Sequence, residues 1–123
     1  MATEVLINDG GAPARILPFL IHDTIAAGDP LDIHTNGKVK PTATSGSAIA
    51  GFALTAASGL DNMCNVITGK GVVLKANSAN AIAAGTLVAQ NGAGKITAAK
   101  TADVKIGVAL EAAADNVVKI LVF

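Results

Sequence analysis

The stretch that decides the fold is "IAAGTLVAQNGAGKITAAKTADVKIGVALEAA", residues 82–113, because a version of it occurs twice. Residues 25–57 read "IAAGDPLDIHTNGKVKPTATSGSAIAGFALTAA", and the two "IAAG" segments are 57 positions apart (82 − 25). Both stretches consist of short apolar runs separated by turns that are rich in Gly, Asn and Ser. The chain therefore carries an internal duplication.

The spacing within the two copies is almost constant. "GKV" at 37–39 and "GKI" at 94–96 also differ by 57 positions (94 − 37), whereas "GFALTAA" at 51–57 and "GVALEAA" at 107–113 differ by 56 (107 − 51). One residue is therefore missing from the second copy between these two landmarks. Two copies are too few for a solenoid, which needs at least three, and they favour two halves of one barrel or sandwich.

Each copy has the pattern of β-structure. "PLDIHT" (30–35) and "TLVAQ" (86–90) have the length and apolar pattern of strands, and turn signals follow both. The pair Asn36-Gly37 predicts a type I′ hairpin turn, in which both central residues have positive φ. About eight to ten short strands at this spacing indicate a mainly β fold. We expect a small β-barrel or β-tulip-like domain built from two internally duplicated halves, with at most short helical turns.

Two segments leave a helical alternative open. "GVALEAAADN" (107–116) is rich in alanine and long enough for about two helical turns on propensity, yet its partner in the first copy contains Thr55 and Gly59. A strand over 104–111 is therefore the favoured prediction. Residues 76–85 could hold another short helical turn. Pro30 and Pro41 should lie at strand starts or sheet edges, because proline cannot donate to a ladder.

The expected domain organisation is a single domain preceded by an arm. Residues 1–13 form an extended N-terminal arm, with the linker-like segment "INDGGAP" at its end. Residues 14–123 form one duplicated β-domain, in which copy one spans about 25–67 and copy two about 82–123. The first residues include an acid and no basic run, so no secretory signal is predicted.

Composition excludes several classes of function. Nine basic and nine acidic residues balance, so no basic surface points to nucleic acid, and there is no Trp or Tyr to stack on bases or sugars. The uncharged run 41–60 is as long as a spanning helix, but it consists mostly of Ala, Gly, Ser and Thr, and no membrane span is predicted.

The residues that could carry chemistry do not form a recognised constellation. His22 and His34 are the only histidines; Asp32 and His34 would share one face of a strand, which allows a surface ion pair but supplies no nucleophile. Cys64, the only cysteine, is interpreted as a buried small hydrophobe, and no zinc or calcium spacing is present. We expect no catalytic, cofactor-binding or metal-ligating residues and no enzyme activity.

Two glycine-rich turns partly match the pattern of a phosphate-binding loop. "GAGK" (92–95) and "TGKG" (68–71) lack both the earlier glycine and the Ser or Thr after lysine that a P-loop requires. Both are therefore interpreted as hairpin turns with an exposed lysine. Lys70 is the only candidate for a lipoyl-type modified lysine, and its flanking residues do not fit.

The repeated phrase resembles the head-decoration, or capsid cement, proteins of tailed bacteriophages. The residues that carry the resemblance are Ile25–Gly28, Gly37–Val39 and Gly51–Leu54 in one copy and Ile82–Gly85, Gly94–Ile96 and Gly107–Leu110 in the other. The resemblance implies a non-enzymatic virion protein that is made in the bacterial host cytoplasm. Such a protein binds the outside of an expanded capsid through the major capsid protein and acts there as a trimer.

The N-terminal arm is the expected capsid contact. In proteins of this kind an extended arm often adds to a coat-protein strand, and strand addition needs an extended segment with free backbone groups. The candidate residues are Ala2, Thr3, Glu4, Val5, Leu6 and Ile7. The alternatives are a phage fibre-base or tail accessory domain, or a small-ligand or glycan-binding β-domain, which the low aromatic content disfavours.

Overall fold

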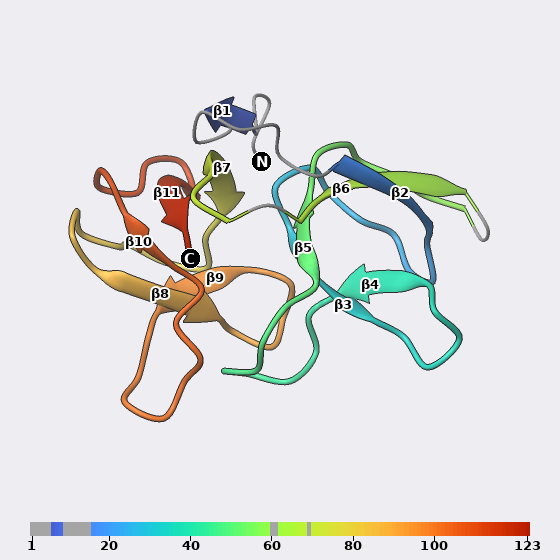
Figure 1. The fold of residues 1–123 in the computed structure, drawn as a ribbon. Helices are drawn as coiled ribbons and strands as arrows, with labels where there is room; N and C mark the ends of the chain where they lie inside the picture. The colour runs from blue at the N-terminus through green and yellow to red at the C-terminus, as the bar shows by residue number, and fades with distance from the viewer. Residues whose placement is uncertain (1–5, 9–15, 60–61, 69) are drawn as a thin grey trace.

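Two lobes lie side by side in the computed structural model, each built on one antiparallel sheet (Figure 1). The structure describes residues 6–8, 16–59, 62–68 and 70–123. The strands are β1 (Leu6–Asn8), β2 (Ile16–Leu20), β3 (Pro30–Ile33), β4 (Val39–Pro41), β5 (Gly51–Ala53), β6 (Met63–Ile67), β7 (Val73–Asn77), β8 (Leu87–Gln90), β9 (Ile96–Ala98), β10 (Gly107–Ala109) and β11 (Val117–Val122).

The two sheets have the same strand order. One sheet runs β2-β6-β5-β3-β4, and the other runs β1-β7-β11-β10-β8-β9, so each strand of the first has a counterpart in the second and only β1 is extra. We call residues 16–67 the N-half and residues 73–122 the C-half. The duplication predicted from the sequence is confirmed, and it extends further towards the N-terminus than the sequence pattern does, because β2 and β7 are also counterparts.

Each half curls until the residue after its first strand, β2 or β7, meets the last strand of its sheet, β4 or β9, at a single bridge. An isolated parallel bridge joins Ile21, directly after β2, to Val39 at the start of β4, and the counterpart bridge joins Ser78 to Ile96. The displacement is 57 residues in both members of the pair (78 − 21 and 96 − 39). No ladder closes either sheet, so the halves are open, curled sheets compatible with a β-tulip-like fold rather than complete barrels.

One turn prediction is wrong, and the reason is local. At the hairpin after β3, Gly37 donates its N–H to the His34 carbonyl at 2.8 Å and has a φ of 84°, but Asn36 does not have positive φ. One left-handed glycine after a turn is typical of a longer hairpin loop, not of a type I′ turn. The residues that do have consecutive positive φ are Asp115 and Asn116, at 55° and 61°, between the bridged pair Ala114 and Val117.

The helical alternatives do not occur in the structure. Residues 107–109 form β10, residues 104–106 and 110–111 are irregular, and the described residues contain no helix. None of them forms a helix long and apolar enough to cross a membrane. Pro30 opens β3 and Pro41 ends β4, an end strand of its sheet, as predicted.

The hydrophobic core is divided unequally between the halves. The smaller cluster lies within the N-half and consists of Ile21, Ile25, Leu31, Val39, Ala53, Cys64 and Val66. The larger cluster fills the C-half and also contains Phe52 and Ile67 from the N-half. These two side chains therefore anchor one half in the core of the other.

Candidate interaction surfaces

The junction between the halves has a buried polar centre. Asp29, 5% exposed, follows the "IAAG" turn of the N-half. Its carboxylate accepts a hydrogen bond from Asn77 Nδ2 at 2.8 Å and lies 3.4 Å from Lys95 Nζ, both on the C-half. Asn77 also donates its side-chain amide to the Ala27 carbonyl at 2.8 Å and its backbone N–H to the Gly28 carbonyl at 3.0 Å. The turn of one half is thus bound by the end of β7 in the other.

A loop of the N-half crosses to the C-half beside this centre. Gln90 is fully buried at the end of β8, and its side-chain amide donates to the Thr44 carbonyl. Its backbone carbonyl accepts from the Gly46 N–H at 3.1 Å. A Cβ at Gly92 would lie 2.8 Å from the Ser45 backbone nitrogen, so only glycine allows the loop to approach this closely. The "GAGK" turn therefore serves as a packing surface for the N-half, which is what its glycines are needed for.

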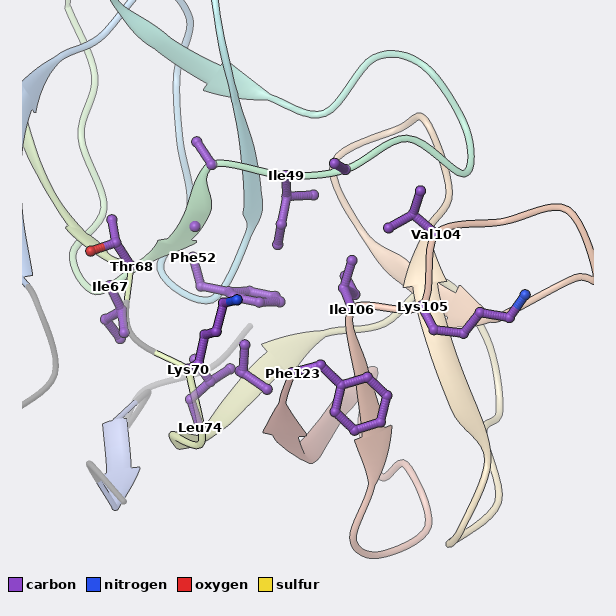
Figure 2. A pocket seen from close by; sticks show the side chains of 14 residues that line it. Ile49, Phe52, Ile67, Thr68, Lys70, Leu74, Val104, Lys105, Ile106 and Phe123 are labelled. Atoms are coloured by element: carbon purple, nitrogen blue, oxygen red, sulfur yellow. The ribbon is translucent and has the colours of Figure 1, made fainter. Parts of the chain in front are cut away.

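A mainly apolar hollow of about 360 Å³ opens at the same junction. Phe52 and Ile67 line it from the N-half, Leu74 and Ile106 line it from the C-half, and Phe123, the residue that follows the C-half, completes it (Figure 2). Phe52 is 1% exposed and cannot offer its face to a sugar or base, whereas Phe123 is 51% exposed. A hollow of this kind has few of the convergent polar groups that orient small ligands, so the glycan or ligand alternative gains no support from it.

The histidines are near each other but not in a catalytic arrangement. The rings of His22 and His34 stack with centroids 3.8 Å apart and an interplanar angle of 16°. Asp32 does not pair with His34; its carboxylate instead accepts from the Ala43 N–H at 3.3 Å. Among the residues that the structure describes, no group of three or more His, Cys, Asp or Glu side chains could hold a metal.

Cys64 is a core residue. It is fully buried on β6, and its thiol donates to the Thr55 carbonyl at 3.3 Å. Burial raises the pKa of the Cys64 thiol above its ordinary value. A buried thiol with a raised pKa is a weak nucleophile, in agreement with its interpretation as a small hydrophobe.

An exposed apolar face lies on the N-half, at positions whose counterparts are buried. Leu17, Leu20 and Ile33 are 43%, 40% and 49% exposed. Their counterparts in the C-half, 57 residues further on, are Leu74, Asn77 and Gln90, which are 0%, 2% and 0% exposed. Leu17 and Leu20 point to opposite sides of β2, because successive side chains of a strand alternate between its two faces. Leu20 and Ile33 occupy the positions of Asn77 and Gln90, which both bind the N-half, and we call these two residues the apolar face. Exposed large apolar side chains at positions of this kind are candidates for an interaction site.

Comparison with known protein families decides the identity of the chain. The family described as "Phage cement protein" matches residues 60–123, which is just over half of the chain (64 of 123 residues) and covers β6 to β11. The chain belongs to the phage cement protein family. It is therefore a phage structural protein, from a family whose members are virion components on the capsid.

The fold of this cement protein is also found in a solved phage structure. The crystal structure of the N base of head fibre gp8.5 from bacteriophage phi29 matches with a TM-score of 0.72 over 90% of this chain and 95% of that one. The sequence identity is 11%, so the likeness shows a common fold and nothing more. No curated protein matches the chain by sequence.

The predicted capsid-binding arm of the cement protein is only partly described. Ala2, Thr3, Glu4 and Val5 lie outside the described residues. Leu6 and Ile7 lie in β1, which pairs antiparallel with β7 of the same chain. A role for these residues in capsid binding stays a prediction.

Sequence reasoning did not find the apolar face or the polar junction. Leu17 and Leu20 lie in "ILPFL" and their counterparts lie in "VLKAN", segments that share only one residue, so the repeat was not visible there. The available signal was the difference at equivalent positions. Asn77 and Gln90 are polar and buried, whereas their counterparts Leu20 and Ile33 are apolar and exposed. Buried positions usually carry the apolar residues, so this distribution indicates that the two halves have different neighbours at these positions.

Proposed function

We propose that this cement protein binds the outside of an expanded phage capsid as a trimer and stabilises it by contacts with the major capsid protein. Family membership carries the proposal, since the matched region spans just over half of the chain. The protein acts after synthesis in the bacterial host cytoplasm and remains on the capsid surface of the virion. This role requires no catalytic, cofactor-binding or metal-ligating residues.

The mechanism is thermodynamic. A protein that binds only the expanded shell lowers the free energy of that state by mass action, and the effect is multiplied over many sites on one particle. A nearly neutral surface suits this role, because many copies must lie close together on the shell without mutual repulsion.

The arm supplies the contact that reaches the coat. β1 is the end strand of its sheet, with β7 on one side and no strand on the other among the described residues. A coat-protein strand that adds to this outer edge would extend the sheet by main-chain hydrogen bonds. The candidate residues Ala2–Ile7 are thus proposed to bind the coat while β1 stays paired with β7.

Co-sedimentation tests the capsid role. Purified protein is mixed with undecorated expanded capsids and, separately, with unexpanded precursors of the source phage, and both mixtures are run through a density gradient. Saturable binding to expanded shells alone is expected, together with a higher temperature of shell disruption. Protein that stays at the top of both gradients would contradict the proposal.

A pair of truncations tests the arm. A chain that lacks residues 2–8 loses β1 and all six candidate residues and should no longer sediment with expanded capsids, whereas a chain that lacks residues 2–5 keeps β1 and should bind more weakly than the full chain. Circular dichroism of both chains controls for folding. Undiminished binding by the shorter chain would show that the coat is bound elsewhere.

The fold favours one second candidate. Because the N base of a phage head fibre has this fold, the protein could instead form the base of a fibre on the head. Gold-labelled antibody on intact virions separates the two roles: label spread over the whole shell indicates cement, and label only at fibre attachment points indicates a fibre base.

A further inference from the structure

We propose that the apolar face of the N-half binds the C-half of a second copy of this chain, in a head-to-tail contact that repeats the junction inside the chain. The inference names the surfaces that hold the homo-oligomer of the proposed function together. It rests on the duplication and not on the capsid, so it is tested without one.

The junction uses a different side of each half. The N-half contributes its "IAAG" turn and Asp29, and the C-half contributes the end of β7 and Gln90. In a tandem duplicate, one such contact leaves two matching surfaces without a counterpart: the β2 side of the N-half and the turn of the C-half. A second copy supplies both.

Burial shows that both of these surfaces are uncovered. In the N-half turn, Gly28 is buried, while its counterpart Gly85 is exposed. Pro30, next to that turn, is buried, while its counterpart Leu87 is 43% exposed. On the other side of the contact, the residues of the apolar face are exposed where their C-half counterparts are covered. The exposed regions are therefore the β2 side of the N-half and the turn of the C-half, the two surfaces that the tandem duplication leaves without a partner in the described part of the chain.

The chemistry of the two surfaces matches. Leu20 stands where Asn77 binds the carbonyls of Ala27 and Gly28, so its partners in a second copy are Ala84 and Gly85. Ala83 and Ala84 are exposed, and Leu87 lies close along the chain. The buried carboxylate Asp29 is replaced in this turn by Thr86. Leu20 would therefore meet the alanine side chains of this turn, and the contact would form without burying a carboxylate.

This contact is heterologous, because a face meets a turn and not another copy of itself. Repetition of such a contact gives a closed ring when the rotation closes, and three copies complete the ring of the proposed trimer. Each copy then uses its apolar face once and its C-half turn once.

Light scattering after size exclusion tests the contact on the full chain. The wild type should elute as an oligomer, and both Leu20→Asp and Ala84→Asp should elute at the mass of one chain, 12.1 kDa. Phe123→Asp is the matched control, since Phe123 is a similarly exposed apolar residue outside both surfaces, and it should stay oligomeric. Circular dichroism checks that each variant is folded, and Ile33→Asp replaces Leu20→Asp if that variant is not.

Mixing the two variants decides whether the surfaces meet. Leu20→Asp keeps an intact turn and Ala84→Asp keeps an intact apolar face, so an equimolar mixture should form a one-to-one dimer and nothing larger. A monomeric wild type, variants that stay oligomeric, or a mixture that remains monomeric would each overturn the proposal. Loss of capsid binding by a chain that still oligomerises would affect only the proposed function.

Discussion

The two halves of this protein have the same order of strands, but their first strands, β2 and β7, have different neighbours. β2 and β7 hold equivalent places, yet β7 is covered by β1 at its start and by the turn of the N-half at its end. Within the described part of the chain, β2 has neither neighbour. The consequence is visible at one pair of residues: Leu17 is 43% exposed and Leu74 is 0% exposed. The duplication kept the arrangement of the strands, whereas the segment that covers each edge strand determines which of its side chains are buried.

The difference teaches that a half is not a complete unit. The C-half core contains Phe52 and Ile67 of the N-half, whereas the N-half core contains no residue of the C-half. One half therefore depends on the other for its packing. The substitutions below measure how large that dependence is.

The largest effect is expected at Phe52. This side chain, 1% exposed, lies in the C-half core, and Phe52→Ala should lower the free energy of unfolding by about 3–5 kcal/mol through lost burial and the cavity left behind. Its counterpart Val108 is only half-buried, and Val108→Ala should cost about 1 kcal/mol. Urea unfolding followed by circular dichroism measures both. Equal losses would break the comparison, because they would mean that the halves are equally dependent.

The fold was predictable to the extent that the duplication left a pattern in the sequence. "IAAG", "GK" and "G(F/V)AL" survive in both copies because each marks a turn or a strand whose backbone is used in the same way. The type I′ turn was assigned to Asn36-Gly37 because that pair is its usual sequence, but the loop there is longer and only its glycine is left-handed. Asp115-Asn116, a less usual pair, takes both left-handed positions.

The interaction surfaces were not predictable for a different reason. Asp29 and Asn77 are 48 residues apart, and nothing near either one in the sequence indicates that the two side chains meet. Whether Leu20 is core or surface depends on which strand lies beside β2. A strand pattern cannot contain that information, since it shows which residues share a face but not what covers it.

A smaller effect is expected at the polar centre of the junction. Asp29→Ala removes the carboxylate that accepts hydrogen bonds from Asn77 Nδ2 and from the Ala26 N–H. The free energy of unfolding should fall by about 2–3 kcal/mol, because both hydrogen bonds to the buried carboxylate are lost together. Thr86→Ala, the counterpart change in the C-half, should alter stability by less than about 0.5 kcal/mol. Thermal unfolding of both variants compares them. A costly Thr86→Ala in dissociated protein would show that the C-half turn has a partner within the chain.

The smallest effect is expected where the halves are most alike. Cys64 and its counterpart Val118 are both buried, so Cys64→Val should change the free energy of unfolding at neutral pH by less than about 1 kcal/mol. Their pH dependence should differ. Burial raises the pKa of the Cys64 thiol, so the folded protein keeps this proton to a higher pH than the unfolded chain does. The stabilising contribution is therefore complete below the thiol pKa of the unfolded chain and is lost as the pH rises from there to the raised value. Thermal midpoints measured at a series of alkaline pH values should fall faster for the wild type than for Cys64→Val. Parallel curves would mean that the thiol ionises as readily in the folded protein as in the unfolded chain, and that this part of the N-half core is open to water.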